Sequence, residues 1–363
     1  MHPALGELTQ ADLTRMLELF WHPVCTTAEL DASPSGVVPA RLLGRDLAVA
    51  RLQAPGVGDL DAGVAALVDR CPHRSTRLSV GCVDGGALRC AYHGWRWGAD
   101  GRCVDIPSMP GVPVPSRARV EGFSAQRRHG LVWVRIDDGA DTSIPPLPAA
   151  SEADMKVVAG APYTWPTAAP RRLENFVDLA HFAWVHDGSL GRRDQPVPPI
   201  PSVERVAGEL RFGFDPPAPD ELDAAALFGS SSYRIVLPLT VDIEFAIAQR
   251  PGVRRRLWMT ACPLDPGACR TFWHVARSDG HDEPDDLHLA FQDRVLAEDG
   301  PVVCNQVPPE LPLEPGLEIS VRTDRVSIEY RRWLLELVRA GRDGGGPAVA
   351  AALAGVSAAV PAG

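Results

Sequence analysis

Two short pairs of metal-binding side chains must meet in space if they serve one centre. The first is Cys71-Pro-His73 and the second is Cys90-Ala-Tyr-His93, with sixteen residues between them. Thiolates and imidazoles are ligands of zinc sites and of iron–sulfur clusters. Zinc sites usually contain a closely spaced Cys-Cys pair, whereas each pair here joins one Cys to one His. The pattern therefore favours an iron–sulfur centre over zinc.

Each pair can give its cysteine to one iron and its histidine to a second iron. This division of ligands is that of a Rieske [2Fe–2S] centre, in which two histidines replace two of the usual cysteines. Respiratory-chain Rieske proteins carry a further cysteine beside each pair, and here those neighbourhoods hold Thr76 and Tyr92. The loops therefore look like those of Rieske oxygenases or ferredoxins.

The order of the expected elements places this centre in a small β domain. Residues 1–20 form an amphipathic pattern that predicts a short helix. From 21 to 140, short apolar runs are broken by Gly, Pro and Asp, as in antiparallel sheets. Residues 141–340 combine helical segments with strands between 231 and 277, and the Gly/Ala-rich tail 341–363 is expected to be disordered. The predicted fold class is α+β, with an all-β N-terminal domain and a C-terminal domain in which helices cover an antiparallel sheet.

A second group of polar residues lies on a helix expected at 173–187. It contains Asn175-x2-Asp178-x2-His181-x4-His186. The first three are spaced three apart, so they share one ridge of the helix. His186 lies about 140° away from His181 on a straight helix. If both histidines bind one metal, the helix must bend, break or include a wide turn there, as helices often do at functional sites.

Two histidines and one carboxylate form the facial triad of non-haem Fe(II) oxygenases, which leaves positions for O2 and substrate. We select Asp293 as the carboxylate because its helical neighbours are apolar, so that its charge needs a partner. Glu298 is a weaker choice, since an arginine one turn earlier could pair with it. Asp299 adjoins a Gly-Pro pair, where the helix is expected to end.

The two groups together resemble the terminal oxygenase components of the Rieske non-haem iron oxygenases, over about residues 18–340. A "QDR" helix followed by a "YRRW" helix is similar to the group that contains vanillate O-demethylase and other α-subunit-only oxygenases. The resemblance implies a Rieske domain followed by a catalytic domain of the helix-grip type. It implies that Cys71 and Cys90 bind one cluster iron and that His73 and His93 bind the other.

The same resemblance implies that His181, His186 and Asp293 bind a mononuclear Fe(II). Asp178 would bridge His181 to a cluster histidine of the neighbouring subunit in a head-to-tail homotrimer, and Asn175 would lie near the iron. Such enzymes use O2 and electrons from NAD(P)H. Because no Gly-x-Gly-x-x-Gly follows an expected strand, we expect a separate ferredoxin or reductase to deliver the electrons.

The expected function is monooxygenation, by hydroxylation or demethylation, of a small aromatic or alicyclic molecule. A ring cis-dihydroxylating dioxygenase remains an alternative, as does a Rieske electron-transfer protein without a working second iron site. The net charge of −10 disfavours nucleic acid as a partner. With no secretory pattern and no apolar run long enough for a membrane span, we expect a soluble cytoplasmic protein.

The substrate pocket is expected between residues 190 and 300, although core packing is the commoner role of aromatic side chains. The candidates for its walls are Phe228, Tyr233, Phe245, Trp258 and Phe272.

Overall fold

The computed structural model separates the chain into two compact units. The smaller unit is Glu18–Ile144, and the larger unit joins Met1–Leu17 to Pro145–Gly363. The residues that the structure describes are 7–52, 63–214, 228–248, 250–314 and 316–355.

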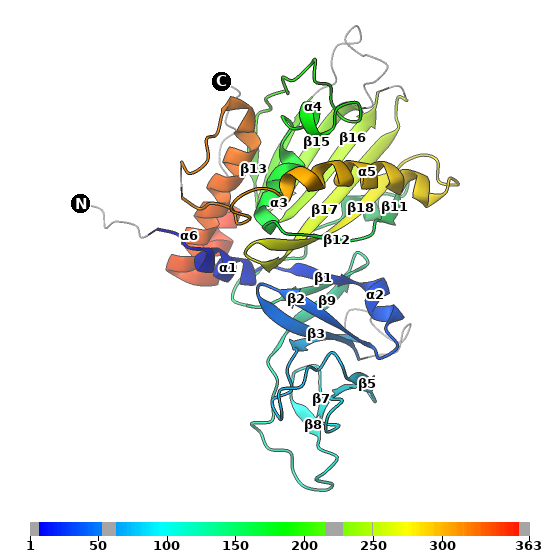
Figure 1. Ribbon diagram of the computed structural model, residues 1–363, viewed down its shortest axis with the longest axis vertical. Helices are drawn as coiled ribbons and strands as arrows, with labels where there is room; N and C mark the ends of the chain where they lie inside the picture. Colours follow the sequence, from blue (N-terminus) through cyan, green and yellow to red (C-terminus); the bar gives the residue numbers. More distant parts are fainter. Residues whose placement is uncertain (1–6, 53–62, 215–227, 249, 315, 356–363) are drawn as a thin grey trace, which may run out of the picture. The chain divides into compact units, whose positions relative to one another are not determined.

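The smaller unit contains a six-stranded antiparallel sheet in the order β1-β10-β9-β4-β3-β2 (Figure 1). Its strands are β1 (His22–Thr26), β2 (Val37–Leu42), β3 (Arg45–Arg51), β4 (Val64–Val68), β9 (Gly122–Arg128) and β10 (Leu131–Arg135). Helix α2 (Thr27–Ala32) follows β1 and begins with a capping box between Thr26 and Glu29.

Between β4 and β9 the chain builds a second, four-stranded sheet in the order β5-β6-β7-β8. The strands are β5 (Cys82–Asp84), β6 (Ala87–Arg89), β7 (Arg96–Trp97) and β8 (Cys103–Asp105). Strands this short bury little surface, so their stability depends on a shared core. That core contains Leu78, Leu88, Trp97 and Ile106, and the two motif cysteines belong to it.

The larger unit is built on an eight-stranded antiparallel sheet. Its order is β11-β18-β17-β16-β15-β14-β13, and β12 pairs with β18 beside β11. The strands are β11 (Lys156–Ala159), β12 (Tyr163–Trp165), β13 (Glu204–Val206), β14 (Glu209–Phe214), β15 (Phe228–Val236), β16 (Thr240–Ile247), β17 (Arg254–Asp265) and β18 (Ala268–Arg277).

Helices cover this sheet, as Figure 1 shows for α3 (Ala169–Val177), α4 (Phe182–Val185) and α5 (Asp285–Val303). Helix α3 packs against β16, β17 and β18, and α4 contacts α5. Helix α1 (Gln10–Glu18) ends at the boundary between the two units, and all of it except Glu18 belongs to the larger unit. Two short 3-10 helices, η2 (Pro148–Ser151) and η3 (Arg322–Asp324), complete the described elements. The expected α+β fold, with helices on an antiparallel sheet, is confirmed.

The expectation of a disordered tail from residue 341 is wrong for residues 341–354. Helix α6 (Arg325–Ala354) includes them, with a kink at Gly345, whose φ of +63° suits glycine. Val349 is fully buried, and the indole of Trp333 donates a hydrogen bond to the carbonyl of Ala352 at 3.2 Å. The low-complexity segment therefore packs back against its own helix because its small apolar residues still offer surface to bury. Residues 356–363 lie outside the described part.

None of the helices in the described ranges has both the length and the apolar composition needed to cross a lipid bilayer.

Candidate cluster and mononuclear metal centres

The two Cys/His loops of the smaller unit have the same backbone geometry. In each, the cysteine carbonyl accepts a hydrogen bond from the amide four residues later, Ser75 at 2.8 Å and Gly94 at 3.0 Å. In each, the cysteine amide donates to the carbonyl five residues later, at 2.8 Å and 2.9 Å. Ser75 and Gly94 both have positive φ, 58° and 73°. The two loops are therefore matched in backbone conformation, as expected for two halves of one ligand set.

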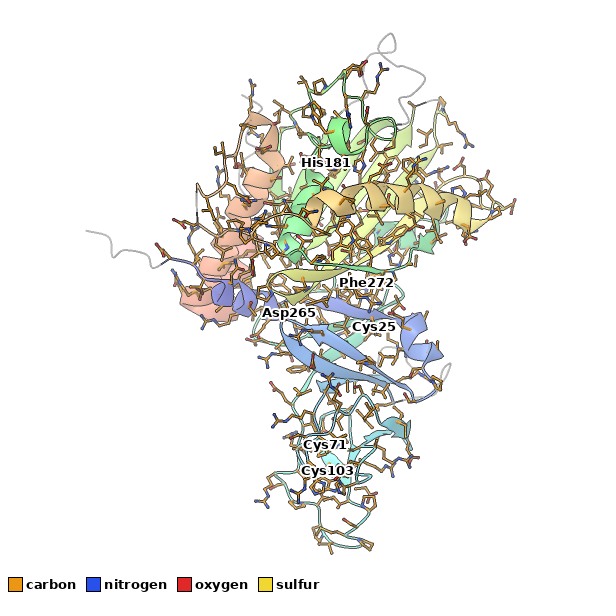
Figure 2. The ribbon with its side chains drawn as sticks, in the orientation of Figure 1. Cys25, Cys71, Cys103, His181, Asp265 and Phe272 are labelled. Carbon is orange, nitrogen blue, oxygen red and sulfur yellow. The ribbon has the colours of Figure 1, made fainter. Side chains whose placement is uncertain are left out.

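The cysteines of the two loops lie inside the protein, and the histidines lie nearer its surface. Cys71 and Cys90 are each 2% exposed, and Figure 2 shows Cys71 near Cys103 in the core of the four-stranded sheet. Burial, with the adjacent Cys90, raises the pKa of the Cys71 thiol to about 11. Two neighbouring buried thiolates therefore need a compensating cation, which a metal cluster supplies.

The imidazoles of His73 and His93 face each other with ring centroids 4.5 Å apart. The His73 ring also stacks on Trp95, at 4.5 Å between centroids. His73 Nδ1 is buried and has no hydrogen-bond partner among the described residues. An orphaned imidazole nitrogen beside two buried thiols fits a cluster with two thiolates on one iron and two imidazoles on the other.

In the larger unit, the helix expected at 173–187 is broken. Helix α3 ends at Val177, and the four-residue helix α4 begins after His181 and ends before His186. The two histidines therefore flank one helical turn, and their Nε2 atoms approach to 3.2 Å. The irregularity expected between the two histidines is misplaced: the stretch between them is the helical turn α4, the break lies before His181, and the backbone becomes non-helical only at His186, where ψ is 34°.

The chain leaves α4 through a tight loop that returns to the second histidine. The Gly191 amide donates to the His186 carbonyl at 3.2 Å. A Cβ on Gly191 would lie 2.5 Å from the backbone of Phe182, so only glycine permits this close approach. The loop therefore fixes the end of α4, and with it the direction of the His186 side chain.

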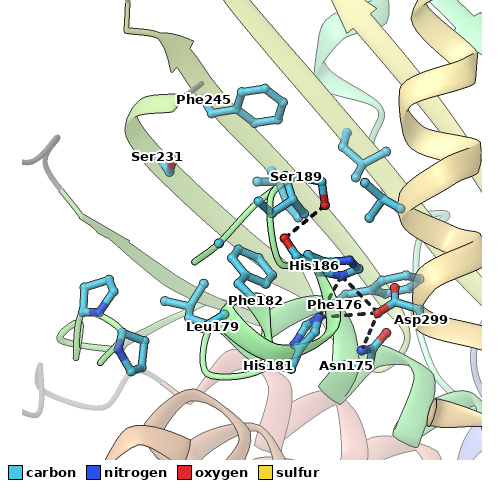
Figure 3. Close-up of a pocket in the computed structure, with 18 of the residues that line it drawn as sticks. Asn175, Phe176, Leu179, His181, Phe182, His186, Ser189, Ser231, Phe245 and Asp299 are labelled. Carbon is cyan, nitrogen blue, oxygen red and sulfur yellow. Dashed lines mark hydrogen bonds and ion pairs between the residues drawn. The ribbon is translucent and has the colours of Figure 1, made fainter. Parts of the chain in front are cut away.

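The carboxylate that meets the two histidines is that of Asp299, on α5. Its Oδ1 lies 3.4 Å from His181 Nε2 and 3.2 Å from His186 Nε2 (Figure 3). Ligand atoms about 2.1 Å from one metal and at right angles to each other are about 3 Å apart. The three atoms therefore have the spacing of a facial triad around a single ion.

The choice of Asp293 as the third ligand is corrected to Asp299. Asp293 is exposed on α5, and so are its neighbours Ala290 and Ala297. Helix α5 continues to Val303 through the Gly-Pro pair, so Asp299 lies inside the helix and not past its end. Six residues along a helix turn a side chain about 120° away, which places Asp293 on the solvent face.

A carboxylate faces the outer nitrogen of each histidine. Glu298 Oε2 lies 2.7 Å from His186 Nδ1 and accepts a hydrogen bond from Ser189 Oγ at 2.9 Å. Asp178 Oδ2 lies 3.4 Å from His181 Nδ1, and its Oδ1 accepts the Ala180 amide at 2.8 Å. Carboxylates in this position orient metal-binding imidazoles and make them better donors.

The electrostatics of the triad favour a cation between its members. Burial opposes a charge on His181, but hydrogen bonds with Asp178 and Asp299 outweigh it and raise the pKa of His181 to about 9. Burial would raise the pKa of Asp299, but His181, His186 and Arg172 hold it well below its usual value. The site thus attracts positive charge, held as a proton on His181 when no metal is bound, and Fe(II) would supply that charge in place of the proton with the carboxylate and the two imidazoles as ligands.

Two families match most of the chain. Residues 20–116 match the Rieske [2Fe-2S] domain, and residues 165–340 match the vanillate O-demethylase oxygenase C-terminal domain. The methylxanthine N1-demethylase NdmA of Pseudomonas putida is 40% identical over 337 residues, which cover 92% of each chain. The methylxanthine N3-demethylase NdmB of the same organism is 40% identical over 330 residues, 88% of this chain and 89% of NdmB.

The chain belongs to the Rieske terminal oxygenases of the vanillate O-demethylase-like group. The solved structure of Pseudomonas putida NdmA with caffeine agrees, with a TM-score of 0.87 at 38% identity over 95% of this chain and 98% of that one. As a Rieske oxygenase, the protein is an oxidoreductase that uses a [2Fe–2S] cluster, a mononuclear iron and electrons from a partner reductase or ferredoxin. Its class of reaction is the monooxygenation of a small organic molecule, and the relatives include N-demethylases and an O-demethylase.

The Rieske oxygenase has a cavity of about 890 Å³ beside the triad. Side chains of α3, α4 and α5 form one side of it, and the inner strands of the sheet form the other (Figure 3). Most of the wall is apolar, including Leu179, Phe182, Ile243, Phe245 and Met259. Such walls exclude water and bind flat organic molecules.

Of the aromatic side chains expected to line the pocket, some line the cavity and others pack in the hydrophobic core. Tyr233 and Phe245 line the cavity. Trp258 and Phe272 are each 1% exposed and pack in the core of this unit. The side chain of Phe228 lies outside the described residues. These outcomes follow strand alternation, because residues on one face of β15 and β16 look into the cavity.

The spacing of the buried residues along α5 could have identified Asp299 as the third ligand. The choice of Asp293 considered only the apolar neighbours of each carboxylate. The buried positions of this helix include Gln292, Val295, Asp299 and Val303, spaced by three or four residues. A carboxylate on such a stripe points inward, whereas Asp293 falls between its members. Glu298 precedes Asp299, and its role depends on a loop far away in sequence, so no local signal reveals it.

Proposed function

We propose that this Rieske oxygenase removes a methyl group from a neutral, planar heterocycle that carries ring carbonyls. The observation that carries the proposal is the polarity of the cavity. Its described cationic side chains are all paired, while two buried neutral polar side chains have no partner. The proposed cluster ligands are Cys71, His73, Cys90 and His93, and the proposed Fe(II) ligands are His181, His186 and Asp299.

The pairing of cations argues against an anionic substrate. Arg172 contacts Asp299 at 3.5 Å, and Arg192 pairs with Asp194 at 2.6 Å. The histidines face carboxylates. An aromatic carboxylate would enter the described part of this cavity without a cation to compensate its charge, at a cost of several kcal/mol. A neutral substrate avoids that cost.

Two buried polar side chains in the wall support a substrate with hydrogen-bonding edges. Gln292 is 7% exposed and Tyr233 is 5% exposed. Neither the carboxamide nor the hydroxyl has a hydrogen-bond partner within the described ranges. Burial alone raises the pKa of Tyr233, which is consistent with an unpaired hydroxyl. Because both side chains line the cavity, a ligand that excludes water from it must form hydrogen bonds with these groups or leave them unpaired, at a cost of about 1–3 kcal/mol each. The two relatives at 40% identity are named for methylxanthines, which are heterocycles of this kind.

The chain's own residues bind and orient the substrate. The apolar wall holds the ring plane, and Gln292 and Tyr233 hold its polar edge, so that one methyl group faces the triad. An iron held by His181, His186 and Asp299 would supply the activation of O2. With two electrons from NAD(P)H and two protons, one oxygen atom would enter the methyl C–H bond and the other would leave as water, and the hydroxymethyl group would then leave the ring nitrogen as formaldehyde while the nitrogen regains a proton.

For the assembly we propose a head-to-tail homotrimer, in which the cluster of one subunit serves the iron of its neighbour. Exposure of groups near both centres supports this arrangement. His93 is exposed beside Tyr92, whose side chain is 63% exposed. Near the mononuclear site, the Asp178 side chain is 35% exposed, and Trp184 is 59% exposed. Asp178 would then join His181 to a cluster histidine of the partner.

The test is formaldehyde release with a surrogate reductase and NADH. We expect caffeine and related N-methylated lactams to give formaldehyde and a demethylated product, and vanillate to give none. Gln292→Leu should lower kcat/KM roughly 10-fold or more, because about 1–3 kcal/mol of hydrogen bonding is lost. Gln195→Leu is the matched control, since Gln195 lines the same cavity but is exposed. Turnover of vanillate, with no turnover of neutral heterocycles, would contradict the proposal.

A further inference from the structure

Helix α3 places a completely buried arginine beside the proposed iron site. Arg172 is 0% exposed. Its Nε and Nη2 both donate to the hydroxyl of Tyr163, at 2.9 Å and 2.7 Å. Its guanidinium carbon lies 3.8 Å from the ring centroid of Phe176 and 4.4 Å from that of Trp165. Because moving a charged guanidinium out of water costs free energy, the surrounding side chains must compensate its charge and its hydrogen-bonding groups.

The remaining nitrogen of this guanidinium is directed to the triad. Nη1 donates to Asn175 Oδ1 and lies 3.5 Å from Asp299 Oδ2. The Asn175 amide in turn donates to Asp299 Oδ1 at 3.2 Å. The side chain of Arg172 is therefore fixed at one end by Tyr163 and contacts the triad at the other.

The two oxygens of Asp299 consequently have different surroundings. Oδ1 faces the Nε2 atoms of His181 and His186, at 3.4 Å and 3.2 Å, and its only other described contact is the neutral amide of Asn175 at 3.2 Å. Oδ2 faces Arg172. An oxygen that is engaged by a cation is a poorer metal ligand than one that is not, because the same lone pairs and charge serve both.

We propose that Arg172 is a positioning residue that holds Oδ2 of Asp299, so that this carboxylate gives the metal one oxygen and not two. The inference rests on the iron site proposed above. An iron held by two imidazoles and one carboxylate oxygen would keep more positions for other ligands than one that is also held by the second oxygen. Arg172 would thereby preserve a position for a small gaseous ligand.

The proposal predicts an effect opposite to that of simple structural damage. In Arg172→Met, the carboxylate can chelate and a nearby positive charge is gone, so Fe(II) should be held at least as tightly as in the parent. Nitric oxide, a probe for open positions on Fe(II), should bind roughly 10-fold more weakly, because the second carboxylate oxygen would compete with it for a position. Arg172→Lys should recover part of the nitric oxide affinity, since one ammonium can reach Asp299 or Tyr163 but not both.

Arg171 supplies a matched control on the same helix. It is 2% exposed, and its guanidinium contacts the Glu310 carbonyl and Glu318, both at 2.8 Å. Arg171→Met removes an equally buried charge away from the triad, so nitric oxide affinity should not change. Tyr163→Phe releases the other end of Arg172 and should weaken nitric oxide binding by a smaller factor.

The experiment titrates anaerobic, dithionite-reduced protein with nitric oxide and follows the electron paramagnetic resonance signal of the iron–nitrosyl adduct. Total iron and sulfide are counted in each sample.

Full iron with weakened nitric oxide binding in Arg172→Met, but not in Arg171→Met, would support the proposal. Unchanged nitric oxide binding would overturn it, and so would loss of the mononuclear iron with an intact cluster. If Arg172→Met loses the cluster as well, Tyr163→Phe is judged by the same criteria. A parent protein that lacks the third iron would overturn the proposed iron site itself.

Discussion

Three carboxylates surround the two histidines of the mononuclear site, and their surroundings distinguish their roles. Asp299 is 5% exposed and meets both Nε2 atoms, as a ligand must. Glu298 and Asp178 face the outer nitrogens, from which a carboxylate would orient an imidazole without binding the proposed ion itself. Adjacent residues on one helix, Glu298 and Asp299, thus contact opposite sides of the same imidazole.

Glu298→Gln tests the orienting role at His186. A carboxamide keeps the size of the side chain but removes the charge that strengthens the imidazole as a donor. We expect the affinity for the mononuclear Fe(II) to fall roughly 10- to 100-fold, with the cluster unaffected. The measurement is iron retention during dialysis against a chelator.

Glu283→Gln is the control for that experiment. Glu283 also pairs with a histidine, at 2.9 Å from His288 Nε2, but neither residue belongs to the triad. It should retain iron as the parent does. Equal retention in the Glu298 and Glu283 variants would mean that His186 needs no carboxylate partner.

The residue types that can bind a metal are visible in the sequence. Which of them act together can be predicted only when they lie close together along the chain. The two Cys/His pairs and the two histidines stand within short stretches, so their chemistry is visible in the sequence. Asp293 and Asp299 are both carboxylates near apolar residues, and the choice between them depends on which face of α5 is buried. Arg172 and Glu298 have roles set by contacts far apart in sequence, which no local pattern encodes.

The helices and strands differ in how well short sequence patterns predict them. Alternating apolar residues correctly indicated the antiparallel sheet, because the pleat requires that alternation. Metal geometry predicts an irregularity between the two histidines, since one ion cannot join residues on different faces of a straight helix, whereas the chain is broken between α3 and α4, before His181. The end of α5 was misplaced because a proline near the end of a helix loses only one hydrogen bond, and tertiary packing compensates it. In α6, small apolar residues resembled a disordered tail, but they bury against Trp333.

At the scale of the whole molecule, the proposed trimer makes each active site a joint product of two subunits. A variant without the iron site, His181→Ala, still holds a cluster, and Cys71→Ser lacks the cluster but keeps the triad. Each alone should be inactive. Mixed in equal amounts, they should recover about one quarter of parent activity, the fraction of correct neighbours in a randomly mixed closed ring.

Recovery requires that subunits exchange or are produced together, so the formation of mixed trimers is checked with two affinity tags. Asp178→Asn introduced into the His181→Ala chain should leave that recovery unchanged, whereas in the Cys71→Ser chain it should abolish it. Mixed trimers without activity would rule out electron transfer between subunits.

The central claim is that one chain holds a Rieske cluster and a separate iron bound by Asp299. The most direct measurement counts iron and acid-labile sulfide in anaerobically purified protein, beside Asp299→Ala and Asp293→Ala. We expect about three irons and two sulfides per chain in the parent and in Asp293→Ala, and about two irons and two sulfides in Asp299→Ala. Loss of the third iron in Asp293→Ala with retention in Asp299→Ala, or zinc in place of iron and sulfide, would contradict the account.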